Sequence, residues 1–430
     1  MTAAQDTAKR DGPRAAVRLP RTYLAGAVSV AAITAVAIVA FVGLMLRPKT
    51  DSGIRVWLLN HTPDQVVIVN PFDGVIEKEF QVADGLRGLT FSRDGGKAYI
   101  YNVVDVSNRL SVIDARTYLK EEVIEVDGVP QGIGVFPDNR RLAVILGSKS
   151  DFMAGGFDVL DLYEPSRADP RKKKRLYRER DLSLTHKLAV ADDGDRIYCI
   201  DAKSDKIHVF SLGQGEKVGE INLYGAPEEM LYPRVGNYYY VSVLQHRAIY
   251  QLNKATDTVV AVYIYGFVDP ERRWSGGKLR HMAVDSEARY LVGTNYEQKT
   301  IALWDLKDRG KNDVAWQDVP FYPEVFEGSY RFQLPHYLPV KRVKLKGGYD
   351  PNLGYVPGGQ QIAVDPLDEY VFVVDDRGAL YVYDFLTVLQ AEELSTPEPR
   401  ELVIDLADDT TEIRDIKIAQ AAVRSAPDEE

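Results

Sequence analysis

The stretch LSVIDARTYLKEEVIEVDGVPQGIGVFPDNRRLAV, residues 110–144, decides the fold of this chain. It contains short runs of alternating or continuous apolar residues, separated by Asp, Gly, Pro and Asn. Short apolar runs bounded by such turn residues indicate β-strands. A similar stretch, RGLTFSRDGGKAYIYN, occurs at residues 87–102. The sequence therefore predicts a repeated unit that is rich in strands.

The same three-part phrase recurs along most of the chain. A short strand with small residues leads to Asp, Gly or Asn, a strand rich in tyrosine or valine follows, and a third strand ends in a polar residue and a turn. A weaker fourth strand follows several of these units. The second strands at 98–102 and 142–147 begin 44 residues apart, which is typical of a four-stranded propeller blade.

These phrases resemble the YVTN-type β-propeller repeat, which reads V-S-V-I-D, then a strand, then P-x-G-I-A-V-x-P-D-G-x-x-A-Y-V-x-N. Residues 110–144 and 87–102 match that pattern best, and the likeness extends more loosely after residue 150. The resemblance implies a fold rather than a function. Such propellers occur in quinoprotein amine dehydrogenase subunits, in a lyase of streptogramin antibiotics and in surface proteins.

Counting the repeated strands predicts an all-β, seven-bladed β-propeller. Second and third strands each occur seven times, whereas the first strand occurs six times between residues 86 and 368. The chain enters the repeat at a second strand, 56–60, and a further inner strand is available at 413–419. We expect the C-terminal strand to pair beside the N-terminal one, because that pairing leaves no open sheet edge. The predicted propeller spans 55–420, and 421–430 is expected to be a disordered tail.

An apolar segment precedes the propeller. Residues 23–46 contain no charged side chain, and a helix of that length spans roughly 36 Å, enough for a bilayer core of about 30 Å. A cleaved signal peptide would have a shorter apolar region, and a core helix would show a polar face. The tail 1–22 carries more Lys and Arg than the linker 47–54, which predicts a cytoplasmic N-terminus. We expect a single-pass anchor in the inner (cytoplasmic) membrane, with the propeller in the periplasm or outside the cell.

The composition argues against several classes of function. The 63 acidic residues outnumber the 53 basic ones, for a net charge of −10, whereas nucleic-acid-binding proteins present a basic face. The single cysteine, Cys199, cannot form an internal disulfide or a Cys-rich zinc site, and a buried apolar role is expected for it. The sequence shows no nucleophile elbow, no P-loop and no paired metal-ligating histidines. We therefore predict no cofactor, no metal site, no catalytic residue and no nucleic-acid partner.

Strand order assigns each connection to one of two ends of the predicted ring. We call the end where the inner strands begin the upper end. A residue near the start of each inner strand should rim the central channel there, and all seven such residues are polar or charged. This pattern fits a wet channel mouth or, because three of them are arginine, a small anionic ligand. These residues are Arg87, Gln131, His186, Glu228, Arg280, Gln360 and Arg414.

Two long insertions are expected at the opposite, lower end, where the chain enters from its apolar segment. The segment 161–176 carries a basic run that is either a solvated loop or a contact for anionic lipid headgroups or an acidic partner. The segment 307–340 either covers its own blade or docks a membrane-embedded partner, because insertions of that size often carry an interface. The basic run is Arg171, Lys172, Lys173, Lys174 and Arg175, and the aromatic residues of the second insertion include Trp316, Phe321, Tyr322, Phe326, Tyr330, Phe332 and Tyr337.

These features favour a non-catalytic scaffold or accessory subunit of a larger membrane protein complex. The resemblance implies one alternative, an accessory propeller subunit of a periplasmic quinoprotein-type dehydrogenase. A small-anion-binding or lyase-like propeller that uses the upper channel mouth is another. Because propellers host many functions, the fold alone does not decide between them.

Overall fold

The structure is a computed structural model, and the chain falls into two compact units, residues 1–52 and 53–430. It describes residues 53–62, 64–82, 85–102, 108–147, 154–183, 185–201, 204–223, 225–244, 247–265, 279–295, 300–307, 313–314, 336–344, 361–365, 367–374, 380–392 and 412–420. The predicted cytoplasmic tail 1–22, the anchor 23–46 and the C-terminal tail 421–430 lie outside the described residues. Within the described ranges, no helix is long and apolar enough to cross a membrane.

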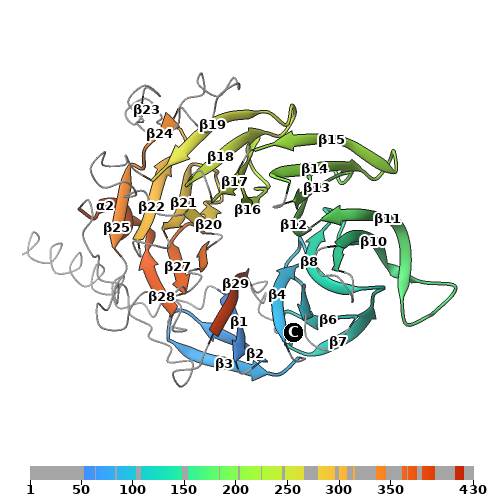
Figure 1. The fold of residues 1–430 in the computed structure, drawn as a ribbon. Coiled ribbons are helices and arrows are strands. Elements are labelled where there is room, and N and C mark those ends of the chain that lie inside the picture. Colours follow the sequence, from blue (N-terminus) through green and yellow to red (C-terminus); the bar gives the residue numbers. More distant parts are fainter. Residues whose placement is uncertain are drawn as a thin grey trace, which may run out of the picture. The chain divides into compact units, whose positions relative to one another are not determined.

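The described residues form seven β-sheets, which follow one another around a ring within residues 53–430 (Figure 1). We call these sheets blades A to G, and their strands are given from the innermost outward. Blade A contains β29 (Glu412–Gln420), β1 (Ile54–Thr62), β2 (Asp64–Asn70) and β3 (Val75–Phe80). Blade B contains β4 (Leu86–Phe91), β5 (Lys97–Asn102), β6 (Arg109–Asp114) and β7 (Lys120–Glu125). Blade C contains β8 (Val129–Val135), β9 (Arg141–Gly147), β10 (Ala154–Pro165) and β11 (Lys173–Ser183).

The remaining blades follow the same order, with additions in blade E and a shorter blade G. Blade D contains β12 (Thr185–Val190), β13 (Arg196–Asp201), β14 (Lys206–Ser211) and β15 (Glu216–Asn222). Blade E contains β16 (Pro227–Leu231), β17 (Tyr238–Val243), β18 (Ala248–Asn253), β19 (Val259–Ile264), β24 (His336–Tyr337) and β23 (Asp313–Val314). Blade F contains β20 (Leu279–Val284), β21 (Tyr290–Asn295), β22 (Thr300–Asp305) and β25 (Lys341–Lys344). Blade G contains β26 (Gln361–Val364), β27 (Tyr370–Val374) and β28 (Leu380–Asp384), which α2 (Phe385–Gln390) follows.

The inner strands close the ring. Each inner strand contacts the inner strand of the next blade, and β29 contacts both β26 and β4. β29 pairs antiparallel with β1, with Ile418 opposite Val56, so the C-terminal strand occupies the inner position of the first blade. The chain is a seven-bladed β-propeller, and the predicted fold is confirmed.

Apolar clusters between neighbouring blades hold the ring together. Trp57 on β1 is fully buried and makes edge contacts with the rings of Phe91 and Tyr118 in blade B, at centroid distances of 5.3 and 5.8 Å. Burying an aromatic side chain of this size contributes about 3 kcal/mol. Similar clusters occur between the other blades, because the middle strands are apolar on both faces.

The turn between inner and second strands repeats, and it explains the recurring Asp-Gly and Asp-Asn signatures. A residue with positive φ closes each turn, such as Gly95 (φ 73°) in blade B and Asn139 (φ 54°) in blade C. Glycine and asparagine suit this position, because a side chain with a β-carbon is otherwise strained there. The equivalent residues of blades D, F and G are Gly194, Ala288 and Asp368.

Two of these turns are hydrogen-bonded directly to the next blade. The N–H of Arg93 donates to Oδ1 of Asn139 at 2.5 Å, and the N–H of Ser286 donates to Oδ1 of Asp368 at 2.8 Å. Each donor is the second residue of its turn, and each acceptor is the positive-φ residue of the following blade. Asn and Asp therefore supply an inter-blade bond that glycine at the same position could not.

Arg93 also ties the lower end of the ring across several blades. Its guanidinium donates to the carbonyl of Val190 at 3.2 Å and to Asp192 at 3.3 Å, both in blade D. Its own carbonyl accepts from Arg234 of blade E at 2.6 Å. Burial of its guanidinium lowers the pKa of Arg93 from its usual value. One turn of blade B is thus fixed against blades C, D and E.

Part of the aromatic insertion 307–340 folds back onto blade E. β24 pairs in parallel with β19, placing Tyr337 opposite Tyr263, and their ring centroids lie 5.4 Å apart. Tyr337 is buried. Its predicted place in a partner interface is therefore corrected, because its ring packs between blades E and F.

Candidate functional site

A β-bulge recurs at the upper end of the inner strands. In blade B, Leu86 pairs with Asn102 and Gly88 with Tyr101, so Arg87 is the extra residue between two consecutive pairs. Five other blades shift register at the same level. The residues at these shifts are Gln131, His186, Glu228, Arg280 with His281, and Arg414.

Six of the seven predicted channel-mouth residues therefore occupy equivalent bulge positions. Arg87 is exposed, and Gln131 and Glu228 are partly exposed. Gln360 lies outside the described residues, and for His186, Arg280 and Arg414 the structure describes the strand only. A bulge takes one residue out of the ladder and redirects its side chain. Sequence reasoning found these positions from their place near the start of each inner strand, but it did not predict the bulge.

His281 and Glu229 form a contact between two neighbouring inner strands at this end. Nδ1 of His281 on β20 lies 3.2 Å from a carboxylate oxygen of Glu229 on β16. The His281 side chain is 11% exposed and that of Glu229 is 20% exposed. Blades E and F thus meet at the upper end through a largely buried histidine–carboxylate pair.

The basic run lies in a long hairpin, which we call the clasp, residues 154–183 of β10, β11 and their connection. β10 continues beyond Asp161, its last residue paired with β9, and the tip then reaches blade B. There Lys172 forms an isolated parallel bridge with Glu125 at the end of β7. The clasp therefore joins the outer edge of one blade to the next.

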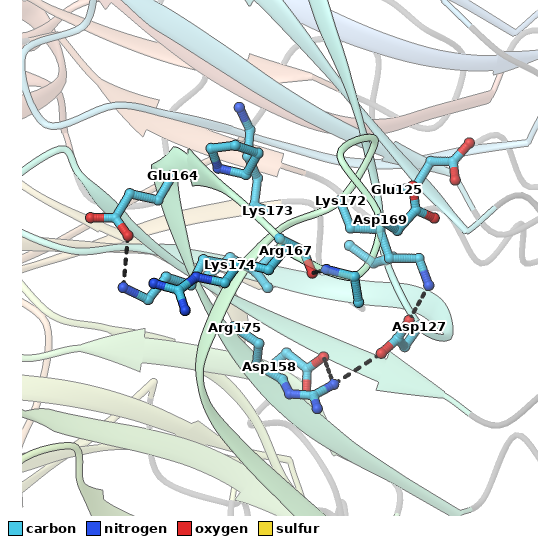
Figure 2. A pocket seen from close by; sticks show the side chains of 15 residues that line it. Glu125, Asp127, Asp158, Glu164, Arg167, Asp169, Lys172, Lys173, Lys174 and Arg175 are labelled. Carbon is cyan, nitrogen blue, oxygen red and sulfur yellow. Dashed lines mark hydrogen bonds and ion pairs between the residues drawn. The ribbon is translucent and has the colours of Figure 1, made fainter.

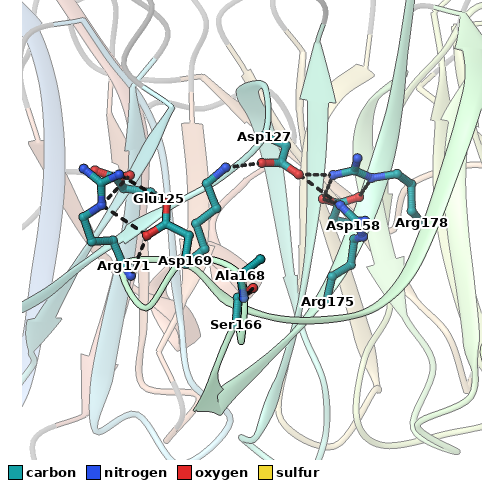
Figure 3. A network of polar contacts seen from close by, with 10 residues as sticks. Glu125, Asp127, Asp158, Ser166, Ala168, Asp169, Arg171, Arg175 and Arg178 are labelled. Carbon is teal, nitrogen blue, oxygen red and sulfur yellow. Dashed lines mark hydrogen bonds and ion pairs between the residues drawn. The ribbon is translucent and has the colours of Figure 1, made fainter.

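Every cation of the basic run forms an ion pair within the chain. Figure 3 shows the pairs of Arg171 and Arg175. Asp127, which follows β7, accepts from Lys172 at 2.5 Å, from Arg175 at 3.0 Å and from Arg178 at 2.7 Å. Arg178 also binds the buried Asp158 of β10 at 2.5 Å. The other pairs join Arg171 to Asp169, Lys173 to Glu122 and Lys174 to Glu164.

These contacts shift the pKa values of the network. Hydrogen bonds from Lys172 and then Arg178 lower the pKa of Asp127 to about 2. The hydrogen bond to Asp158 is the main cause that raises the pKa of Arg178. Asp127 and Arg178 therefore remain charged across the physiological pH range.

A pocket of about 630 Å³ lies between the clasp and the end of blade B (Figure 2). Its walls carry five acidic side chains, among them Asp127 and Asp158, and five basic ones, among them Lys172 and Arg175. The charges balance, and most of them are paired with one another. The pocket is therefore not a basic patch of the kind that attracts anionic lipid headgroups. Contact between the basic run and such headgroups stays a prediction, and the ion pairs within the clasp do not favour it.

Exposed apolar side chains occur at the lower connections of six blades. Among the described residues, eight large apolar side chains are exposed, and all but Leu176 lie in or within three residues of a lower connection. Many upper connections fall outside the described ranges, so the observation concerns the lower end alone. The seven residues, which we call the lower apolar set, are Val75, Leu119, Tyr163, Val218, Val235, Leu367 and Leu386.

The rest of the predicted interface lies mostly beyond what the structure describes. Trp316, Phe321, Tyr322, Phe326, Tyr330 and Phe332 of the aromatic insertion are outside the described residues. The insertion connects β22, the third strand of blade F, to β25, its fourth strand. Connections of this kind lie at the lower end, so both ends of the insertion lie at the lower side of blade F.

The sequence predicts a buried apolar role for the single cysteine and no metal site. Cys199 is fully buried, and burial raises the pKa of its thiol, which confirms its predicted apolar role. No group of three or more His, Cys, Asp or Glu residues that could hold a metal ion occurs among the described residues.

Solved structures of other proteins share the fold of this chain. No protein-family model and no curated protein matches this sequence. A solved structure of Kuenenia stuttgartiensis hydrazine synthase is similar, with 16% identity, a TM-score of 0.56, and 76% of this chain and 91% of that chain covered. A functionally unknown protein from Desulfotomaculum acetoxidans has 11% identity and a TM-score of 0.56, with 80% and 98% covered. The β-propeller domain of Myceliophteria thermophila Cps50 (Swd1) has 12% identity and a TM-score of 0.51, with 76% and 92% covered. Likeness at these identities shows the propeller fold, and membership of the YVTN-type family stays a prediction.

Proposed function

We propose that this chain is a membrane-anchored, extracytoplasmic β-propeller that serves as a non-catalytic scaffold or accessory subunit of a larger membrane protein complex. Its lower end docks a membrane-embedded protein partner. The observation that carries the proposal is the lower apolar set, which places one or two exposed apolar side chains at the lower connections of six blades, where a partner that spans the ring would contact them.

The course of the chain supports this orientation. β1 pairs antiparallel with β29, and its first residue, Ile54, lies opposite Gln420 at the lower end. The apolar segment 23–46 precedes this entry point, and the linker 47–54 can reach at most about 28 Å. A propeller tethered at this point presents its lower end to the membrane that holds the anchor.

The charges of the lower end favour a protein partner over an anionic lipid surface. Its turns carry carboxylates such as Asp138 and Asp192 alongside cations such as Arg116 and Arg234. Mixed charges around apolar side chains are typical of protein interfaces, whereas anionic lipids attract clusters of Lys and Arg. The lower apolar set extends over six of the seven blades, which suits a broad partner surface of about 800 Å² or more.

The test is co-purification of the full chain from native membranes in mild detergent. We expect the triple variant Leu119→Ser, Leu367→Ser and Leu386→Ser to keep its melting temperature, because surface changes cost little, and to lose the subunits that co-purify with the wild type. Leu176→Ser is the matched control, since Leu176 is equally apolar but lies outside the lower apolar set.

The outcomes separate the alternatives. Retention of every co-purifying subunit by the triple variant contradicts docking through the lower end. A partner that proves to be a quinoprotein-type dehydrogenase identifies the accessory-subunit alternative. Binding of the wild type to protein-free vesicles, lost in the triple variant, identifies lipid rather than protein as the occupant of this face.

A further inference from the structure

Blades F and G each bury a carboxylate at the start of a lower turn. Asp285 and Asp365 occupy the first position of the turn between the inner and second strands, and they are 7% and 1% exposed. The equivalent residues of blades B, C and D are uncharged, namely Ser92, Phe136 and Ala191. Two neighbouring blades therefore bury a carboxylate where these three blades bury none.

Backbone N–H groups hold both carboxylates. Oδ1 of Asp285 accepts from two N–H groups of its own turn at 2.6 and 2.8 Å. Asp365 accepts from the N–H of Tyr370 at 2.6 Å and from that of Leu367 at 3.0 Å. Within the described ranges, neither carboxylate forms an ion pair with a Lys, Arg or His side chain. Each is thus a buried acidic group with hydrogen bonds but with no cation to balance its charge.

A direct contact joins the two turns. The carboxylate of Asp368 in the turn of blade G accepts from the N–H of Ser286 at 2.8 Å and from its hydroxyl at 2.5 Å. Ser286 follows Asp285, and Asp368 lies three residues after Asp365. A change in the charge of either buried carboxylate therefore acts at the contact between blades F and G.

The charged residues around the pair supply little compensation. Arg289 and Lys307 of blade F are engaged with Asp305 at 3.5 Å and with Glu287 at 3.7 Å. In blade E, Gly236 adjoins the turn of blade F, and the cation of that turn, Arg234, donates to the carbonyl of Arg93. The charged residues of the packed turns and strand ends are Glu287, Arg289, Asp305 and Lys307 on blade F, Asp368, Glu369 and Asp384 on blade G, and Arg234 on blade E.

These surroundings favour the protonated form of both buried groups. Burial is the main cause that raises the pKa of Asp365 to about 6, and the charges of Glu369 and Asp368 add to the rise. Burial likewise raises the pKa of Asp285. A carboxyl whose folded pKa lies above its unfolded value stabilises the fold fully below about pH 4, and that stability is lost as the pH rises through the folded pKa.

We propose that the contact between the lower turns of blades F and G is a pH-sensitive switch, loose when the two buried carboxylates are charged and tight when protons neutralise them. A buried charge without a partner costs free energy, and protonation removes that cost. Leu367 of the lower apolar set lies in the turn of blade G, so the switch acts on a turn of the lower end. The switch itself does not depend on the proposed docking of that end.

The test is amide hydrogen exchange of the full chain in mild detergent, at about pH 5 and about pH 7.5, on either side of the folded pKa of Asp365. Rates are corrected for the intrinsic pH dependence of exchange. We expect the turns 285–290 and 367–370 to be protected severalfold more at the lower pH. The turn 136–141 of blade C is the internal control and should change little, because its carboxylate Asp138 pairs with Arg141 at 2.6 Å.

Two variants show whether these carboxylates cause the response. Asp285→Asn keeps the oxygen that accepts both N–H groups and removes the charge, so it should melt about 2 °C above the wild type at about pH 7.5 and equally at about pH 5. Asp365→Asn loses the bond from Leu367, so its readout is the change in melting temperature between the two pH values, which should shrink. Asp138→Asn is the matched control and should keep the response of the wild type.

Histidines elsewhere in the chain titrate in the same range, and comparison with the wild type removes their contribution. Loss of the pH response in either variant supports the switch. The inference is overturned if the corrected protection of both turns is equal at the two pH values, or if both variants keep the full response of the wild type.

Discussion

Replacing Asp127 by Asn should loosen the clasp while leaving its shape almost unchanged. Asn keeps the size of the side chain but removes the charge that holds Lys172, Arg175 and Arg178 together. Those three cations would then repel one another, and Asp158 would be the carboxylate left beside Arg175 and Arg178. Blade C should release its hold on the end of blade B.

The magnitude follows from the pKa of Asp127. A carboxyl with a usual value of 3.8 and a folded pKa of about 2 corresponds to about 2.4 kcal/mol at 1.36 kcal/mol per pH unit. The side chain is 34% exposed, and solvent screens such pairs, so we expect a loss of about 1 kcal/mol. For a chain of this size that corresponds to a fall in melting temperature of about 2 °C.

The assay combines thermal unfolding of the full chain in mild detergent with limited trypsin digestion. Trypsin cleaves after Lys and Arg, so the run 171–175 reports directly on the clasp. We expect the wild type to resist cleavage there and Asp127→Asn to be cut several times faster, with less difference at high salt. Asp169→Asn, which loses one exposed partner at the tip of the clasp, is the matched control and should change stability by less than about 0.5 kcal/mol.

The pH dependence has a definite sign. Because the folded pKa of Asp127 lies below the unfolded value, its stabilisation is complete above about pH 4. It is lost as the pH falls toward the folded pKa of about 2. The reasoning is refuted if Asp127→Asn melts and digests as Asp169→Asn does at neutral pH and low salt.

Further predictions concern the turns, the closure, the thiol and the topology. Ala288→Gly should stabilise the chain by about 0.5–1 kcal/mol, because Ala288 has a φ of 52°. Asn139→Gly should destabilise it by about 1 kcal/mol, because it removes the bond to Arg93. Equal shifts in the melting temperatures of these two variants would contradict the inter-blade role of Asn139. Deleting 411–430 removes β29 and should cause aggregation through the open edge of β1, so an unchanged melting curve of the truncated chain would show that β29 is dispensable. Cys199 should react with a thiol reagent only after denaturation, and fast labelling of the native protein would disprove its burial. A reporter fused after Glu430 should be active only if it functions outside the cytoplasm, and activity of a strictly cytoplasmic reporter there would reverse the predicted topology.

The repeated strand pattern of the sequence was enough to predict most of the fold. The apolar phrases predicted the second and third strands of all seven blades, because alternation and turn residues are local properties. The clasp was beyond such reasoning. Nothing in the local sequence of Lys172 or Arg175 indicates that their partner is Asp127, some 45 residues earlier and on another blade, since ion pairs of this kind depend on how blades pack.

Strand position was enough to select the upper residues but not to explain their geometry. Arg87 and Glu228 were found because each lies two residues before an apolar residue of its inner strand, whereas the bulge depends on pairing with the second strand. The lower apolar set was missed altogether. Leu119 and Leu367 are single apolar residues inside turns, and only the strand order of the folded ring brings them to one end.

The central claim is that the lower end of the propeller faces a membrane-embedded protein. Site-specific photo-crosslinking in native membranes tests it most directly, with the crosslinking residue placed at Leu119 in a lower turn or at Ser204 in an upper one, both of which are exposed. We predict a discrete crosslinked product with an integral membrane protein from position 119 and none from position 204. A product from position 204 alone, or from neither position, would contradict the account.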